Sequence, residues 1–343
     1  MATYADSGVH LDDARVITDR LAEIAARTRS ASVLADVGAF GGMLSLGAWD
    51  HLREPVLVAS TDGVGSKVIV AAALGRYDSL GHDIVNHCLN DIAVQGARPL
   101  FFLDYLALHR AKPEIVAALV GGVADACRLA GCALLGGETA EMPDLYAPGG
   151  FDLAGFIVGI VDRAEIGRNG DPQAGDILVG LPSTGLHTNG YSLARRALPP
   201  ETWGRVEPSL GTTIGEALLA PHRSYLNEIG AMTEAGARAF AHITGGGIPE
   251  NLPRVLPPEV AAEVDRDAWE PPAIFRLIAD AGGVPHGEME RVSNMGIGLV
   301  AVLPADRLDA ALAATPEARP IGRLVELDNG ERVRFVGDGR GTG

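Results

Sequence analysis

The chain has 343 residues, of which 47% are hydrophobic and 21% charged, a composition typical of a soluble globular protein with about two domains. Its formal net charge is −16, and because a surface of this sign repels nucleic acid, no nucleic-acid partner is expected. No apolar stretch reaches membrane-spanning length, and the N-terminus shows no basic region followed by an apolar core. These properties predict a cytoplasmic protein with no membrane partner.

The first half of the chain alternates segments of helical and strand character. Residues 11–28 show the apolar spacing of an amphipathic helix. The glycine-rich stretch 36–47 is too irregular for a helix or a strand and predicts a mobile loop or lid. The remaining patterns predict strands at 56–60, 100–108, 132–135 and 153–161, and helices at 81–96 and 113–130.

A turn-rich break at Asn169-Gly170 and Asp171-Pro172 predicts a boundary between two domains, 1–168 and 169–343. After this break, strands and helices again alternate with glycine turns. The patterns predict a strand at 177–181, helices within 214–236, a glycine turn running into a helix at 242–251, a helix at 272–281 and a strand at 297–303. Both halves therefore predict a mixed α/β (α+β) fold.

The segment Thr61-Asp-Gly-Val-Gly-Ser-Lys67 follows a short apolar strand and carries the most distinctive chemistry of the chain. Asp62 can hold a hard cation such as Mg²⁺, and Lys67 can hold phosphate as a point charge. Lys67 is one of only two lysines, the other being Lys112. The spacing differs from that of a P-loop, in which a hydroxyl residue follows the lysine. The alternative is a strand and tight turn with a solvated lysine.

Glycine follows the end of an apolar element, together with a carboxylate, an amide or a hydroxyl, in four places. These are the loops predicted at 61–67, 136–144, 183–192 and 244–251. Exposed N–H groups in such turns bind phosphate oxygens. The acids Asp62, Asp91, Glu138 and Glu141 come from separate elements and would repel one another unless Mg²⁺ lay between them. The alternative is that each acid is a helix cap or a solvated charge.

Histidines supply candidate acid–base groups, because an unperturbed imidazole titrates near neutrality. His187 lies in a glycine loop and is well placed to contact a substrate, whereas His242 precedes another glycine turn. His87 lies on the polar side of the helix predicted at 81–96, and for it a structural role is the favoured interpretation. The other polar residues of that side are Asp83, Asn90 and Asp91.

The three cysteines are Cys88, Cys127 and Cys132. They lack the paired spacing of zinc ligands and lie in apolar surroundings. We interpret them as buried reduced thiols, with a metal-binding or catalytic role as the alternative.

Six motifs of the chain, taken in sequence order, resemble those of the phosphoribosylformylglycinamidine cyclo-ligase family, also called aminoimidazole ribonucleotide synthetases. Each motif is weak alone, but six of them in the right order are specific, and the resemblance covers nearly the whole chain. The motifs lie at 61–67, 90–96, 100–105, 136–143, 187–192 and 244–247.

The resemblance implies the fifth step of purine biosynthesis. ATP would phosphorylate the formyl amide oxygen of formylglycinamidine ribonucleotide, and ring closure would release phosphate. The family fold has two α/β domains with the site in the cleft between them, and homodimers form when the N-terminal sheets join into a barrel. ATP and Mg²⁺ are the implied cofactors, and the need for a monovalent cation stays open.

The resemblance also assigns roles to individual residues. It implies metal binding by Asp62, Asp91 and Glu138, and catalytic roles for Lys67, His187 and Asp62. The implied ATP- or phosphate-binding residues are Gly63, Val64, Gly65, Ser66, Lys67, Asn189, Gly245, Gly246 and Gly247. The implied substrate-binding residues are Ser293, Asn294 and Met295.

Two alternatives to this function stay open. One is another ATP-using enzyme of the same superfamily, such as thiamine monophosphate kinase, selenophosphate synthetase or formylglycinamidine ribonucleotide synthetase. A selenophosphate synthetase would need a reactive cysteine or selenocysteine in the loop 36–47, which has none, and the kinase would lack the Glu-Thr-Ala-Glu-Met-Pro signature. The other alternative is a non-catalytic nucleotide-binding protein.

Overall fold

The computed structural model describes residues 11–35, 37–328 and 330–337. By its internal contacts the chain divides into two units. The first comprises residues up to 92 and 97–163, and the second comprises residues 93–96 and those from 164 onward. The boundary expected after residue 168 lies close to this division and stays a prediction. Throughout the described ranges, no helix combines the length and the apolar character needed to cross a membrane.

The first unit is built on a four-stranded sheet with the strand order β3-β6-β4-β5. β6 lies antiparallel to both β3 and β4, while β5 lies parallel to β4 at one edge. A parallel pair needs a crossover connection, which the helix α4 (Pro113–Ala130) provides. The strands are β3 (Pro55–Gly63), β4 (Arg98–Leu108), β5 (Ala133–Glu141) and β6 (Phe151–Asp162).

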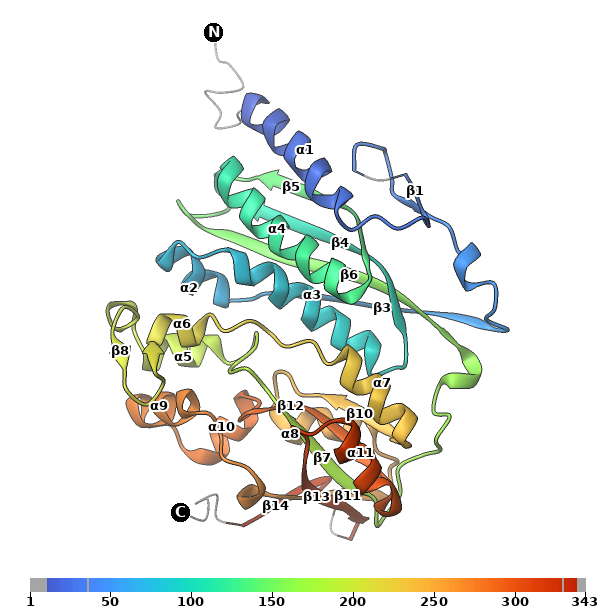
Figure 1. Ribbon diagram of the computed structural model, residues 1–343. Helices are drawn as coiled ribbons and strands as arrows, with labels where there is room; N and C mark the ends of the chain where they lie inside the picture. Colours follow the sequence, from blue (N-terminus) through green and yellow to red (C-terminus); the bar gives the residue numbers. More distant parts are fainter. Residues whose placement is uncertain (1–10, 36, 329, 338–343) are drawn as a thin grey trace. The chain divides into compact units, whose positions relative to one another are not determined.

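Helices cover one face of this sheet, with α3 and α4 lying over its strands (Figure 1). α3 and α4 approach each other closely at Gly81 and Gly122, because a Cβ atom added to Gly81 would lie 2.1 Å from the Val123 nitrogen. Only glycine permits this contact between helix backbones. The other helices of the unit are α1 (Leu11–Ala26) and α2 (Lys67–Leu74), and α3 spans Asp78–Ala93.

Two glycine-rich segments differ from the expectation drawn from the sequence. The loop predicted from residue 136 is wrong in its first part, because residues 136–141 pair with β4 and continue β5. Glycine fits this position of the strand because Gly137 lies opposite Asp104, and a Cβ atom added to Gly137 would lie only 2.3 Å from Asp104 Oδ1. The predicted lid at 36–47 includes a short strand, β2 (Met43–Leu44), paired with β1 (Val33–Ala35); its mobility stays a prediction, and residue 36 is outside the described residues.

The second unit contains a six-stranded sheet with the order β10-β12-β7-β13-β11-β14. All neighbouring strands are antiparallel except β11 and β14. With the helices around them, the two sheets confirm the mixed α/β content expected from the sequence, and over the described residues neither sheet closes into a barrel. The strands are β7 (Ile177–Pro182), β10 (Ala239–His242), β11 (Val260–Asp265), β12 (Ile297–Leu303), β13 (Arg319–Glu326) and β14 (Val333–Val336).

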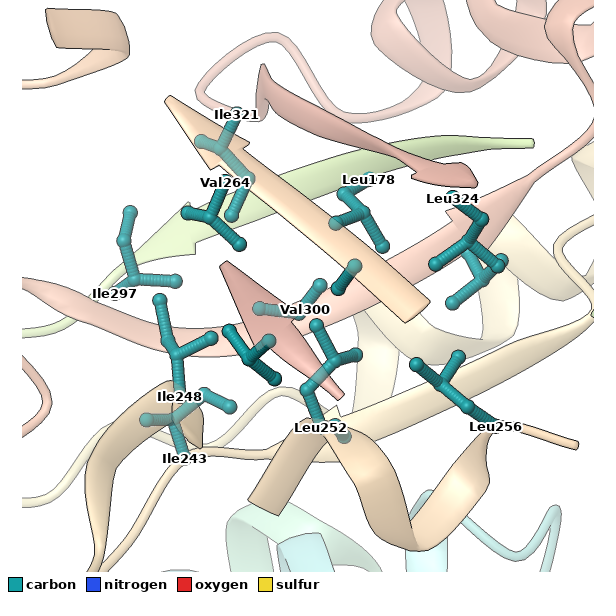
Figure 2. Packing of buried hydrophobic residues seen from close by; sticks show 14 of the residues in the cluster. Leu178, Ile243, Ile248, Leu252, Leu256, Val264, Ile297, Val300, Ile321 and Leu324 are labelled. Atoms are coloured by element: carbon teal, nitrogen blue, oxygen red, sulfur yellow. The ribbon is translucent and has the colours of Figure 1, made fainter. Parts of the chain in front are cut away.

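The central strands of this sheet bury both faces, because alternate side chains enter two separate hydrophobic cores. Leu178 packs in the first core with Val300 and Leu252, as Figure 2 shows. Its neighbour Val179 packs in the second core with Tyr225. Burial on both faces explains why β12 reads as an unbroken apolar run in the sequence.

The helices of the second unit are short. The helical region expected at 214–236 is divided into α6 (Ile214–Leu218) and α7 (Leu226–Ala235), and Pro221, which has no N–H group to donate, lies between them. The other helices are α5 (Tyr191–Ala197), α8 (Gly247–Asn251), α9 (Ala273–Gly282), α10 (His286–Val292) and α11 (Leu308–Ala314). The minor elements of the two units together are β8 (Val206–Glu207), β9 (Thr212–Thr213) and the 3₁₀ turns Gly47–Trp49, Arg163–Glu165, Pro200–Thr202, Leu252–Val255, Arg266–Ala268 and Ala305–Arg307.

Candidate functional site

In the first unit, the end of β3 lies against α3 and brings two of the predicted cation ligands together. Asp91 accepts a hydrogen bond from the Ser60 hydroxyl over 2.9 Å, and the Nε2 atom of His87 lies 3.5 Å from the Asp62 carboxylate. Side-chain atoms of His87 and Asp91 able to bind a metal lie within 4.8 Å of each other. Asp62 and Asp91 are thus neighbours of the same imidazole. Their oxygen donors fit a hard cation such as Mg²⁺.

Lys67, predicted to meet phosphate, begins α2 and has a side chain with 0% exposure. Its Nζ atom lies 2.8 Å from each carboxylate oxygen of Asp83, which is buried to the same extent. Burial lowers the pKa of Lys67, and the neighbouring Asp83 carboxylate opposes this shift. The structure therefore places the ammonium group against Asp83 and away from solvent, and contact with phosphate stays a prediction.

Glu138 does not lie beside the other two predicted cation ligands of the same chain. Asp62 on β3 pairs with Gly155 on β6. Gly155 pairs in turn with Asp104 on β4, and Asp104 pairs with Gly137 on β5. At about 4.8 Å per strand, β5 lies roughly 14 Å from β3. Because Glu138 follows Gly137, the pleat directs it to the opposite face of the sheet from Asp62, so its share in the cation site stays a prediction.

A cavity of about 500 Å³ opens in the first unit beside β5. Its polar wall includes the segment 136–141 and Asp104, whose exposure is only 8%. Burial raises the pKa of Asp104 to about 7. We did not select Asp104 from the sequence, although a lone acid within the apolar strand 100–108 is a detectable signal. The apolar wall includes Ile17, Leu21, Ala25, Val120 and Leu134.

Asp104 predicts a pH dependence of stability. Its pKa is 3.8 without perturbation and about 7 in the fold, so the native state keeps a proton that the unfolded state loses. The contribution of this group is therefore fully present below about pH 4 and is lost as the pH rises toward 7. Asparagine does not titrate, so the unfolding free energy of Asp104→Asn minus that of wild type should increase by about 2 kcal/mol from pH 5 to pH 8. Urea denaturation at both pH values checks this. If the difference in unfolding free energy between the variant and wild type is the same at pH 5 and pH 8, the prediction is wrong.

In the second unit, the structure brings together three segments that the sequence predicted to bind phosphate or substrate, 187–189, 245–247 and 293–295. A Cβ atom added to Gly245 would lie 3.1 Å from the Asn189 side-chain oxygen. One added to Gly247 would lie 2.9 Å from the Ser293 carbonyl oxygen. Segments far apart in the chain therefore form one surface lined by backbone groups, which is suited to phosphate.

Two residues of this surface have strained backbones. Among the described residues, those with a positive φ that are not glycine are His187, at 62°, and Met295, at 48°. This conformation costs about 1–2 kcal/mol for residues other than glycine and is found where function requires it. The neighbouring contacts hold both residues in place: the Thr184 N–H donates to His187 Nε2 over 3.3 Å, and Trp269 Nε1 donates to the Met295 carbonyl over 2.9 Å.

Two buried asparagines support the loops of this site. Asn294 accepts hydrogen bonds from the Ser183 hydroxyl and the Gly296 N–H, and donates to the Gly185 carbonyl. Asn251 donates to the carbonyl groups of Gly245 and Gly247, over 3.0 and 2.8 Å. Asn294 therefore holds the loop that leads to His187, and its predicted contact with substrate stays a prediction.

His222, which we did not select from the sequence, lies next to the predicted site. Its Nε2 atom lies 3.0 Å from Nε2 of His242, and its ring stacks on His187 with 4.0 Å between centroids. Its Nδ1 atom lies 3.4 Å from the Thr188 hydroxyl. Since one nitrogen of the His222–His242 contact must accept, at most one of the two carries a proton there.

The cysteine prediction is confirmed. Cys88, Cys127 and Cys132 are free and buried. Burial raises the pKa of the Cys88 and Cys127 thiols, so both stay protonated at neutral pH.

Comparison with known proteins matches two family models to successive parts of the chain. The family described as AIR synthase related protein, N-terminal domain, matches residues 22–161, and its C-terminal counterpart matches residues 173–334. The crystal structure of hydrogenase maturation protein HypE in complex with ATP has a similar fold, with a TM-score of 0.67 over 96% of this chain and 92% of that chain, at 17% sequence identity.

Curated relatives are similar over nearly their whole length. The phosphoribosylformylglycinamidine cyclo-ligase of Anaeromyxobacter sp. (strain Fw109-5) is 49% identical over 339 residues, covering 96% of this chain and 97% of its own. The protein of that name from Desulfitobacterium hafniense (strain DSM 10664 / DCB-2) is 46% identical over 308 residues, covering 90% and 91%. The similarity spans both units, and this chain belongs to the phosphoribosylformylglycinamidine cyclo-ligase family.

Proposed function

We propose that this protein uses ATP to convert formylglycinamidine ribonucleotide into 5-aminoimidazole ribonucleotide, with release of ADP and phosphate. The observation that carries the proposal is the convergence of 187–189, 245–247 and 293–295 on one surface of the second unit. The kinship with relatives named as cyclo-ligases supports it. The reaction belongs to purine biosynthesis, for which a cytoplasmic location is expected.

The chemistry divides into two steps. The γ-phosphoryl group of ATP passes to the formyl amide oxygen, which turns that oxygen into a good leaving group and yields ADP. The ring-forming nitrogen then attacks the formyl carbon, the carbon–oxygen bond breaks and phosphate departs. The protein contributes positioning and charge stabilisation.

In the second unit, the proposed tasks are to bind the ribonucleotide and to move a proton. Backbone N–H groups of Gly245 and Gly246 would meet its phosphate, with Asn189 beside them, whereas the Gly247 N–H donates to the Thr244 carbonyl over 3.1 Å. His187 accepts the Thr184 N–H at Nε2, so its neutral ring carries the proton on Nδ1. Nε2 is then its one basic nitrogen, and we propose that His187 takes up the proton lost in ring closure at Nε2 once the Thr184 N–H has moved away from it. Ser293 and Met295 would contact the substrate.

In the first unit, Asp62 and Asp91 would hold Mg²⁺, which neutralises phosphate charge when it is bound to ATP. In the turn 63–66 the Val64 N–H donates to the Leu153 carbonyl over 2.9 Å, so Gly65 and Ser66 would present their N–H groups to the phosphates. The cavity beside Asp104 has an apolar wall and about 500 Å³ of space, within the range of small-molecule sites, and we propose that it receives the adenosine. That HypE crystallised with ATP supports ATP use by this fold.

We further propose that two chains associate through the sheet of the first unit. The strand register places Leu57, Tyr105 and Phe156 on the face opposite Asp62 and Asp104. These large side chains are exposed over 62%, 43% and 39% of their surface. A row of exposed apolar groups on a sheet face marks an interaction surface, and joining two such sheets would give the dimer barrel expected for the family.

The dimer predicts that charge on this face will separate the chains. Phe156→Lys should convert the dimer into a monomer, because two ammonium groups would be buried at the interface without partners. Sedimentation velocity measures the change. The matched control is Leu129→Lys on α4, where the wild-type leucine is exposed over 70% of its surface and the dimer should persist. A dimeric Phe156→Lys variant would contradict the proposal.

The function itself is tested by incubating the protein with Mg-ATP and formylglycinamidine ribonucleotide and measuring the aminoimidazole product by diazo coupling. We expect product and ADP in equal amounts. ATP hydrolysis that is insensitive to this ribonucleotide, or phosphorylation of thiamine monophosphate instead, would favour another enzyme of the superfamily. Nucleotide binding without turnover would favour a regulatory protein.

A further inference from the structure

The side of α3 that faces β3 carries polar residues at intervals of four positions, which places them along one line of the helix. Each of them contacts the segment 60–67, which runs from the end of β3 to the start of α2. We call these contacts the polar ladder; they are Asp83–Lys67, His87–Asp62 and Asp91–Ser60. The ladder therefore joins α3 to both ends of the predicted ATP-binding turn.

Burial differs along the ladder. Lys67 and Asp83 are completely buried, whereas 36% of the Asp62 side chain is exposed. To meet a phosphate, the Lys67 ammonium would have to move out of its fully buried position against Asp83, and weakening a buried ion pair is strongly unfavourable. Asp62 can reach a ligand without any such change.

We propose that Lys67 is a positioning residue: its ion pair with Asp83 fixes the start of α2 against α3, so that the turn 63–66 and Asp62 are held in place for Mg-ATP. The turn contains only four residues, so anchoring Lys67 leaves Asp62 little freedom. His87, one helical turn after Asp83, contacts Asp62 from the same helix. The inference rests on the proposed function in one respect, the assignment of Mg-ATP to this turn.

The first test uses the scarcity of lysine in this chain. Native wild-type protein is treated with formaldehyde and a borohydride reductant, and dimethylation of the two lysines is read by mass spectrometry. Lys112 is exposed and should react, whereas Lys67 should stay unmodified both with and without Mg-ATP. In denaturant both lysines should react. Methylation of Lys67 in the free native enzyme, with protection by Mg-ATP, would overturn the proposal, and this readout does not depend on cyclisation.

The second test is a double-mutant comparison of Lys67→Met, Asp83→Leu and the combined variant, with Lys112→Met as the control that keeps wild-type activity. Each single variant removes one partner of this buried ion pair and should lower activity roughly a hundredfold or more. The double variant replaces the pair with apolar groups and should recover activity to within about tenfold of wild type. If Lys67 touched the phosphoryl group, the folded double variant would be as inactive as Lys67→Met, and the proposal would fail.

Positioning also makes a prediction that a purely structural role does not. In Lys67→Arg, which keeps the charge but changes the geometry, the Mg²⁺ concentration for half-maximal activity should rise about tenfold, while the KM for the ribonucleotide stays unchanged. A lower folded fraction alone would leave the Mg²⁺ requirement as it is. If the double variant fails to fold, two results decide the question: the Mg²⁺ requirement of Lys67→Arg relative to wild type, and the methylation of Lys67. If no variant and no wild-type sample forms product, the proposed function fails instead.

Discussion

Asp62→Asn is expected to lower the rate of ATP-dependent cyclisation by roughly a thousandfold, while the protein stays folded. The substitution keeps the shape of the side chain and removes the negative charge, so it removes the proposed Mg²⁺ ligand at the end of β3. The side chain is partly exposed, so folding does not depend on burying it. The rate should be measured at saturating ATP over a range of Mg²⁺ concentrations, and thermal unfolding should be followed in parallel.

Asp152→Asn is the matched control for this experiment, because Asp152 is an exposed carboxylate on β6 of the same sheet. Its Oδ1 atom accepts a hydrogen bond from the adjacent Leu153 N–H, and it lies outside the proposed site. The control should keep wild-type kinetics. An Asp62→Asn enzyme with near-wild-type turnover would remove Asp62 from the cation site and leave Asp91 without its proposed partner.

The sequence was most informative where a local pattern determines a local structure. The strand predicted at 297–303 has the bounds of β12, whose residues are all buried in the structure. The helix predicted at 113–130 has the bounds of α4, which begins with a proline in its first turn and ends at the left-handed cap Gly131. β11 was missed: its sequence, Val-Ala-Ala-Glu-Val-Asp, is a weak strand pattern, and pairing with β13 and β14 makes it a strand.

The polar side of α3 shows what a helical pattern can and cannot predict. Periodicity placed Asp83, His87, Asn90 and Asp91 together, and such a face is usually solvated. In the structure Asp83 and Asn90 have 0% exposure and His87 has 6%. The reason is that Lys67 and the end of β3 lie against this face. Which element covers a helix face is a tertiary property, so the pattern alone could not predict it.

The candidate site was predicted in part for a similar reason. Glycine turns and their polar neighbours are visible in the sequence, and three of them meet in the second unit. The residues that support them are less visible. Asn251 ends the glycine segment predicted at 244–251, but the sequence does not show that its amide holds Gly245. Nothing in the local sequence of His222 indicates its contact with His242. The separation of Glu138 from Asp62 follows from strand order, which local patterns do not determine.

Gly247→Ala is the second substitution for which we expect a large effect. Gly247 has a φ of 60°, and an added Cβ atom would lie 2.0 Å from the Glu290 carbonyl oxygen. The left-handed backbone costs about 1–2 kcal/mol for alanine, and the overlap with a carbonyl group adds about 1–3 kcal/mol. We expect the free energy of unfolding to fall by about 2–5 kcal/mol, as measured by urea denaturation.

The same substitution should also impair binding of the ribonucleotide, because relief of the overlap must move either the glycine turn or α10, which leads into Ser293. KM for the ribonucleotide should therefore rise while KM for ATP changes little. Gly230→Ala is the matched control: Gly230 lies in the helix α7, where an added Cβ atom has no neighbour within 4 Å and φ is not positive. That change should stabilise the protein by about 0.5–1 kcal/mol and leave both KM values unchanged. Wild-type stability and KM in Gly247→Ala would show that the turn tolerates a different backbone and would weaken its assignment as the phosphate-binding segment.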